Sequence, residues 1–246
     1  MDGDWEIHSE AELEATPEQV WRALATGAGL TAWFSGAIEL QPGPGGTLRS
    51  TTGGYADELS VTAWEPGRRV TYSSTPDADN RFYALEWLVE GRAGGTLLRC
   101  VASGFIPGDD WAAEFDSLRD GGAMYFSSLV QYVRFFLGRN ALLVDAFGPP
   151  QTDWTRAWRV LSDALGIPGV AAVGDRVHLT PAELPPIDGV VFAAAPRLLA
   201  LRADDGLYRF VKAGPVALAS HRLFAADVDP QQTEQAWQAW LTQLFA

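Results

Sequence analysis

Polar and apolar side chains alternate over residues 6–13, and this pattern predicts a half-buried strand. The following Thr16-Pro17-Glu18-Gln19 predicts a helix start, because a hydroxyl at the N-cap, a proline at the first helical position and a glutamine three residues after the cap form a capping box. The Gly27-Ala28-Gly29 cluster ends this helix, and residues 30–34 predict a second, short helical turn.

From Ile38 onward, short runs of β-branched and aromatic residues alternate with Gly- and Pro-rich turns, which is typical of an antiparallel meander. Alternation predicts the inward positions of two of its strands, Tyr83, Leu85, Trp87 and Val89 on one and Leu98, Cys100 and Ala102 on the other. A long helix then follows, with Asp110 as its cap, an apolar stripe near the 3.6-residue period and an end near Gly138.

The segment Phe147-Gly148-Pro149-Pro150-Gln151 predicts a domain boundary, because adjacent prolines interrupt both helices and strand pairing. We therefore expect two domains, residues 1–147 and residues 150–246. After the boundary, Trp, Arg, Leu and Gly recur at the spacing they have in the first helix, with Trp158 placed 137 positions after Trp21.

Strands are predicted at about 187–194, 197–202, 207–212 and 216–223, and Asp229-Pro230 predicts the cap of a closing helix. No first strand is evident before the Trp158 helix. The second domain is therefore expected to be a diverged and truncated copy of the first.

Composition narrows the function classes. The 246 residues carry 18 Lys and Arg against 31 Asp and Glu, a net charge of −13, which argues against nucleic-acid binding. The single cysteine, Cys100, excludes an intrachain disulfide and fits a reducing cytoplasm, where we expect the protein. No apolar stretch approaches the length of a membrane span. Lys212 is the only lysine, and this arginine bias is typical of a GC-rich coding sequence.

Residues 7–138 resemble the START-like (SRPBCC) superfamily of helix-grip proteins, in the branch related to the activator of Hsp90 ATPase. The resemblance lies in the order and spacing of several short motifs: Thr16 to Trp21, Leu30 with Trp33-Phe34, Pro44-Gly45-Gly46-Thr47-Leu48, Gly95-Thr96, Ser103-Gly104-Phe105, and Gly121 with Phe126, Leu129 and Val133. It implies an α+β fold in which an antiparallel sheet wraps round a long C-terminal helix, with a cavity that commonly receives apolar molecules. The family often has a bulky aromatic after the helix glycine, whereas this chain has Gly122-Ala123, which would enlarge the cavity.

Catalytic patterns are scarce. His8, His178 and His221 are far apart and lack metal-ligand spacing, and Cys100 has no neighbouring base, so we expect no metal, no cofactor and no catalytic residue. The paired carboxylates Asp57-Glu58, Asp109-Asp110 and Glu114-Asp116 are interpreted as solvated or capping groups. A cyclase or aromatase function would need a polar group inside the cavity, and Arg99, the nearest candidate, is predicted to point outward.

Aromatic residues are the informative feature. The set predicted to surround an apolar ligand is Trp33, Phe34, Trp64, Tyr83, Trp87, Phe105, Trp111, Phe115 and Phe126. Two main hypotheses stay open: non-catalytic binding of an apolar or aromatic small molecule, and a protein-partner module, either an Hsp90 co-chaperone-like regulator or a subunit that forms a homodimer. A cyclase-like enzyme ranks third.

Overall fold

The computed structural model describes residues 3–108, 111–167 and 169–246. The chain divides into two compact units, Met1–Asn140 and Ala141–Ala246. Each unit has its own sheet and its own long helix, and each is described separately below.

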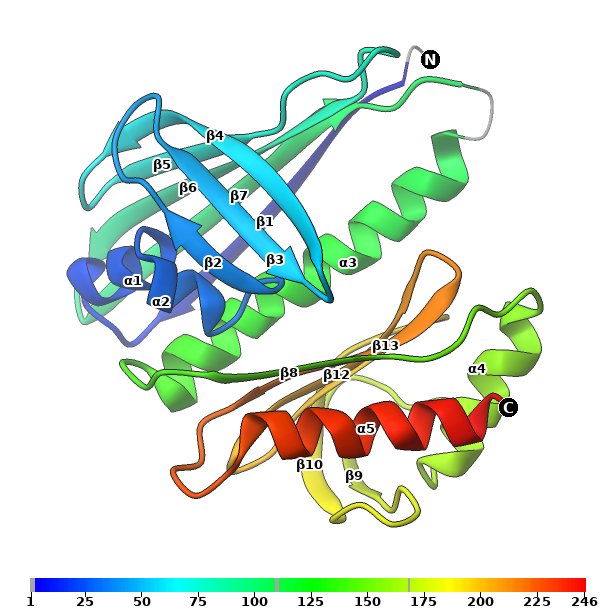
Figure 1. Ribbon diagram of the computed structural model, residues 1–246. Coiled ribbons are helices and arrows are strands. Elements are labelled where there is room, and N and C mark those ends of the chain that lie inside the picture. The colour runs from blue at the N-terminus through cyan, green and yellow to red at the C-terminus, as the bar shows by residue number, and fades with distance from the viewer. Residues whose placement is uncertain (1–2, 109–110, 168) are drawn as a thin grey trace. The chain divides into compact units, whose positions relative to one another are not determined.

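The first unit contains a seven-stranded antiparallel sheet. Its elements are β1 (Asp4–Leu13), α1 (Pro17–Leu24), α2 (Gly27–Thr31), β2 (Ala37–Leu40), β3 (Thr47–Thr52), β4 (Tyr55–Glu65), β5 (Arg69–Ser73), β6 (Phe82–Arg92), β7 (Gly95–Phe105) and α3 (Trp111–Gln131), which continues into the π-helical turn η1 (Tyr132–Phe136). The strand order is β1-β7-β6-β5-β4-β3-β2, so the first strand pairs with the last. Figure 1 shows this sheet curving beside the long helix α3, as the predicted helix-grip fold requires.

The predicted capping box starts α1. The Thr16 hydroxyl accepts a hydrogen bond from the Gln19 N–H (3.3 Å), and the Gln19 side chain accepts one from the Thr16 N–H (2.9 Å). The predicted cap of α3, Asp110, lies outside the described residues.

The second unit contains a six-stranded antiparallel sheet with the order β8-β13-β12-β11-β10-β9. Its elements are β8 (Leu142–Phe147), α4 (Trp154–Ala164), β9 (Arg176–Leu179), β10 (Ile187–Ala195), β11 (Leu198–Arg202), β12 (Gly206–Ala213), β13 (Val216–Leu223) and α5 (Pro230–Leu244). Again the first strand pairs with the last and a long helix closes the unit. The two sheets thus fit the predicted two-copy arrangement, and the second sheet has one strand fewer.

Two details of the predicted organisation were wrong. A first strand does precede the Trp158 helix: β8 pairs with β13 in the second sheet, from Leu142 opposite Leu223 to Phe147 opposite Leu218. The division between the units therefore falls after Asn140 and not at residues 147–150. Pro149 and Pro150 end a strand of the second unit, because proline cannot continue the ladder of hydrogen bonds.

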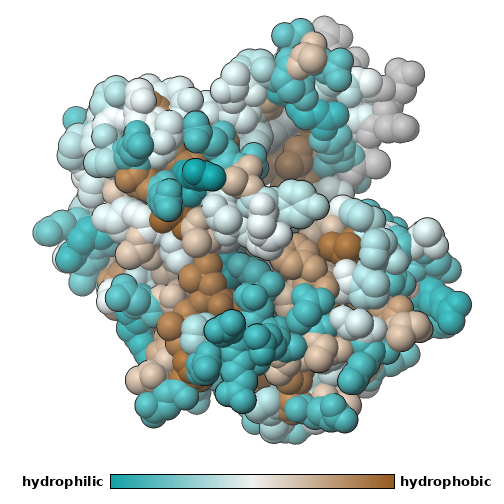
Figure 2. Space-filling model, viewed as in Figure 1, coloured by the Kyte–Doolittle hydropathy of each residue, from teal (hydrophilic) through white to brown (hydrophobic). Residues whose placement is uncertain are grey.

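Hydrophilic residues occupy much of the face shown in Figure 2, and hydrophobic residues form separate patches between them. Among the described residues, no helix is long and apolar enough to cross a membrane.

Candidate functional site

A cavity of about 240 Å³ lies between the sheet and α3 of the first unit. Residues from three strands, the turn after α2 and one face of α3 line it: Trp5, Ile7, Ser9, Phe34, Tyr83, Leu85, Trp87, Cys100, Ala102, Ser117, Leu118, Gly121, Gly122, Tyr125 and Phe126. The inward positions predicted from alternation supply much of this wall.

Strand register explains why these residues meet. Three rungs cross β1, β7 and β6 in that order: Ser9, Cys100 and Trp87; Ile7, Ala102 and Leu85; and Trp5, Gly104 and Tyr83. A Cβ atom at Gly104 would lie 2.3 Å from the Phe82 carbonyl oxygen and 2.8 Å from the Trp5 ring. Glycine at this position therefore lets the Trp5 indole lie across β7 and close one end of the cavity.

The α3 wall is open at two consecutive glycines. A Cβ atom added at Gly121 or at Gly122 would meet no atom within 4 Å. Because these glycines occupy the helix face that lines the cavity, with Ser117 and Leu118 one turn before them and Tyr125 and Phe126 one turn after, their missing side chains leave space that larger residues would fill.

Aromatic rings pack in contact around this space. The Trp87 and Phe126 rings lie 3° from parallel with centroids 6.2 Å apart. Phe34 contacts Tyr125 at 5.0 Å between centroids. The cavity thus offers flat aromatic surfaces to a bound molecule.

Of the nine predicted ligand-contacting aromatics, Phe34, Tyr83, Trp87 and Phe126 line the cavity. Trp33 is buried behind them: its ring packs on Trp87 at 5.4 Å and its indole N–H donates to the Ala23 carbonyl oxygen (2.9 Å).

The other four predicted aromatics also lie outside the cavity wall. Trp64 packs on Trp21 of α1, with 5.2 Å between the ring centroids. Phe115 contacts Trp5 and Trp111, each at 6.1 Å between ring centroids, and so supports the Trp5 end from behind. Phe105 ends β7 and is half-buried. Trp5 itself was missed, because the strand begins at Asp4, two residues earlier than the predicted one.

Polar groups are few in this cavity, and none of the described residues lining it is charged. Burial and, after it, the charge of Glu86 raise the pKa of the Cys100 thiol to about 12, so the thiol stays protonated. Burial, followed by the smaller effects of Asp57 and Tyr125, raises the pKa of Tyr83 to about 12. The Trp5 indole N–H is buried and has no hydrogen-bond partner among the described residues. A bound molecule could supply the missing acceptor.

The other described residues considered for a catalytic role lie outside the cavity wall. Arg99 points outward, as predicted, and its guanidinium lies 3.4 Å from both Glu10 and Glu90. Glu114 pairs with Arg81, and Asp116 pairs with Arg119 (2.8 Å).

His8 and His178 are exposed beside Glu6 (2.6 Å) and Asp188 (2.8 Å). The described part of the chain contains no group of three or more His, Cys, Asp or Glu residues that could hold a metal ion. Asp109 and Asp110 lie outside the described residues.

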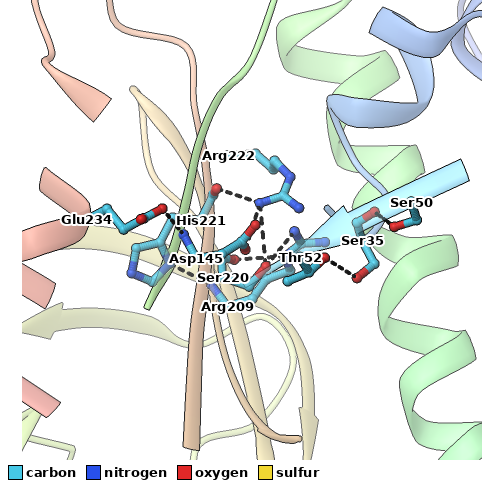
Figure 3. A network of polar contacts seen from close by, with 9 residues as sticks. All are labelled: Ser35, Ser50, Thr52, Asp145, Arg209, Ser220, His221, Arg222 and Glu234. Carbon is cyan, nitrogen blue, oxygen red and sulfur yellow. Dashed lines mark hydrogen bonds and ion pairs between the residues drawn. The ribbon is translucent and has the colours of Figure 1, made fainter. Parts of the chain in front are cut away.

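The second unit holds a buried charged cluster that sequence reasoning missed (Figure 3). Arg222 in β13 donates to Asp145 in β8 (3.2 Å), to the Ser220 hydroxyl (3.4 Å) and to the His221 carbonyl oxygen (2.8 Å). Arg209 in β12 donates to the Ser220 carbonyl oxygen (3.0 Å) and hydroxyl (3.1 Å).

This cluster lies on the sheet face away from α5, because its members alternate with the core residues Val144, Phe210 and Ala219. Burial alone would raise the pKa of Asp145, but the charges of Arg222 and Arg209 and the hydrogen bond from Ser220 outweigh it and lower the pKa. Asp145 therefore carries a full negative charge that compensates the buried guanidinium of Arg222.

Comparison with protein families gives one match: residues 14–134 match the family described as Activator of Hsp90 ATPase homolog 1-like protein. The matched segment runs from the end of β1 into η1 and so contains most of the cavity wall. No curated protein sequence matches the chain.

Several solved structures are similar to one or both units. Protein MLL2253 from Mesorhizobium loti is 23% identical over 52% of this chain and 95% of its own, with a TM-score of 0.45. The Aha1 dimer from Colwellia psychrerythraea is 21% identical over 53% of this chain and 96% of its own, with a TM-score of 0.44. DynU16, a putative protein in the dynemicin biosynthetic locus, is 18% identical over 98% of this chain and 96% of its own, with a TM-score of 0.43.

Proposed function

Because residues 14–134 of this chain belong to the Activator of Hsp90 ATPase homolog 1-like family and line an apolar cavity, we propose that the first unit binds a small apolar molecule between its sheet and α3. The observation that carries the proposal is the space left open at Gly121 and Gly122.

The cavity has the size and chemistry of a small-molecule site. An apolar cavity of about 150 Å³ already holds benzene, and this one measures about 240 Å³. Its aromatic walls and few polar groups favour an apolar or aromatic body, which gains free energy by leaving water. A protein partner would contact an outer surface instead, so the cavity favours the small-molecule function over a partner-protein function.

The first prediction tests this function with a neutral probe, 1-naphthylmethanol, by isothermal titration calorimetry. We expect saturable binding of one probe per chain. Gly121→Leu should raise the Kd about tenfold or more, because the leucine side chain occupies the space that the probe needs. The helix itself should persist, since leucine forms helices better than glycine.

Ala123→Leu is the matched control. Ala123 lies on the same helix, is exposed and does not line the cavity. This variant should bind the probe within about twofold of the wild-type Kd. Absence of saturable binding, or equal affinity in wild type and Gly121→Leu, would refute the proposed function.

A further inference from the structure

A second pocket of about 490 Å³ adjoins the cavity of the first unit. The two spaces share three residues of their walls, Phe34, Tyr83 and Tyr125. The two spaces are therefore neighbours on either side of these three rings, and a molecule that reaches from one to the other has to pass their edges.

The second pocket has a larger polar share in its lining than the cavity has. Ser50 in β3 and Asp57 in β4 lie directly opposite each other in the strand register, and both line it. The Ser50 hydroxyl donates to the Ser35 carbonyl oxygen (2.6 Å), and the Ser35 and Thr52 hydroxyls lie 3.5 Å apart (Figure 3). One side of the pocket thus consists of hydroxyl groups and one carboxylate.

Among the described residues that line this pocket, Asp57 is the only one with a charged side chain. Asp57 forms no ion pair among the described residues, and no Lys, Arg or His is found among the described residues that line either space. The Asp57 charge also acts on Tyr83. Burial is the largest cause of the raised pKa of Tyr83, and the Asp57 charge adds to it, so the phenol stays protonated. A carboxylate or phosphate placed here would meet a like charge without a compensating cation, whereas an ammonium or hydroxyl group would find an acceptor.

We propose that the natural ligand is an amphipathic molecule whose apolar body fills the cavity and whose head, an amine or another hydrogen-bond donor, lies beside Asp57. This inference rests on the proposed function, because it assumes that the cavity receives the apolar body. It adds that the site selects ligands by the charge of the head group. Fatty acids, phospholipids and other ligands with anionic heads are disfavoured.

Three probes with one naphthalene body test the selection: 1-naphthylmethylamine, which is a cation at pH 7, neutral 1-naphthylmethanol, and anionic 1-naphthoic acid. We expect the amine to bind about three- to fivefold more tightly than the alcohol, the size of an exposed charge interaction. The acid should bind more weakly than the alcohol. Asp57→Asn should remove the advantage of the amine over the alcohol.

Glu58→Gln is the matched control. It removes the same charge from the next residue of β4, which points to the opposite face of the sheet. This variant should keep the preference for the amine, so a loss specific to Asp57→Asn separates a local contact from attraction to the net charge of −13.

Equal affinities for amine and alcohol, tighter binding of the acid, or equal losses in Asp57→Asn and Glu58→Gln would overturn the inference. In each case, binding of the alcohol that depends on Gly121 would leave the proposed function standing. If none of the three probes binds, the proposed function fails, and the inference fails with it.

Discussion

His221 in β13 is a fully buried imidazole surrounded by aromatic rings. Its ring centroid lies 4.7 Å from that of Trp237, 4.9 Å from Tyr208 and 5.2 Å from Phe210. Its Nδ1 accepts a hydrogen bond from the Arg209 backbone N–H (3.3 Å), while Nε2 has no partner among the described residues. Burial and, after it, the charges of Arg209 and Arg222 lower the pKa of His221 to about 3, against the opposing charge of Asp145.

A folded-state pKa below the unfolded value makes stability depend on pH. Between pH 6.5 and 3 the unfolded chain binds a proton at His221 that the folded chain does not, so the free energy of unfolding falls as the pH falls, by at most about 1.4 kcal/mol per pH unit. His221→Phe should reduce this loss in urea titrations between pH 6.5 and 4.5. Asp145 does not interfere, because its lowered pKa keeps it ionised there.

The exposed His178 supplies the control for this prediction. His178→Phe should leave the pH dependence close to that of the wild type, because its side chain is 58% exposed and solvent screens its charge. The same pH slope in His221→Phe and in wild type would contradict the assignment of His221 as a buried neutral group.

At the scale of the residue, the sequence predicts which face of a strand a side chain occupies better than it predicts how deeply that side chain is buried. Alternation placed Tyr83, Leu85 and Trp87 correctly, since a strand has only two faces. Trp33 was misplaced because its indole N–H finds a backbone acceptor deep in the core. Trp64 follows a β-bulge between Val61 and Ala63, and such an irregularity shifts which face a residue occupies without leaving a mark in the sequence.

Helix starts were the most predictable elements, because capping depends on a few local residues. Thr16 and Asp229 both cap the helices that were predicted, and the Asp229 carboxylate accepts from the backbone N–H groups of Gln231 (2.9 Å) and Gln232 (3.2 Å). The end of α3 was less predictable: a π-helical turn, Tyr132–Phe136, precedes the turn at Gly138, which has φ +80.

The capping box of α1 makes a prediction at the scale of the element. Thr16→Ala should lower the free energy of unfolding by about 1 kcal/mol, because the N–H of Gln19 loses its acceptor, the Thr16 hydroxyl. Thr16→Ser keeps the hydroxyl and should stay within about 0.5 kcal/mol of the wild type. Urea unfolding checks both variants, and equal losses in the two would show that the hydroxyl contributes nothing.

At the scale of the whole molecule, the repeated strand order is stronger evidence for the two-copy arrangement than the repeated residues are. Both units place the first strand beside the last, although only a few residues around Trp21 and Trp158 recur. β8 escaped prediction because its six residues come soon after a long helix, and a short apolar run has no period that separates a strand from a helix end. Its place is fixed by non-local contacts: pairing with β13, and hydrogen bonds from Gln238 and to Glu234 of α5.

The assignment of β8 to the second unit can be tested by amide hydrogen exchange. Val144 is fully buried in the second core, so Val144→Ala should cost about 2 kcal/mol by leaving a cavity. Amides of β12 and β13 should then exchange about thirtyfold faster, while those of β6 and β7 keep their wild-type rates. Val173→Ala, at a position that is 67% exposed, should change neither set. Faster exchange in β6 and β7 instead would place residues 142–147 in the first unit, because destabilisation spreads through the cooperative unit to which a residue belongs.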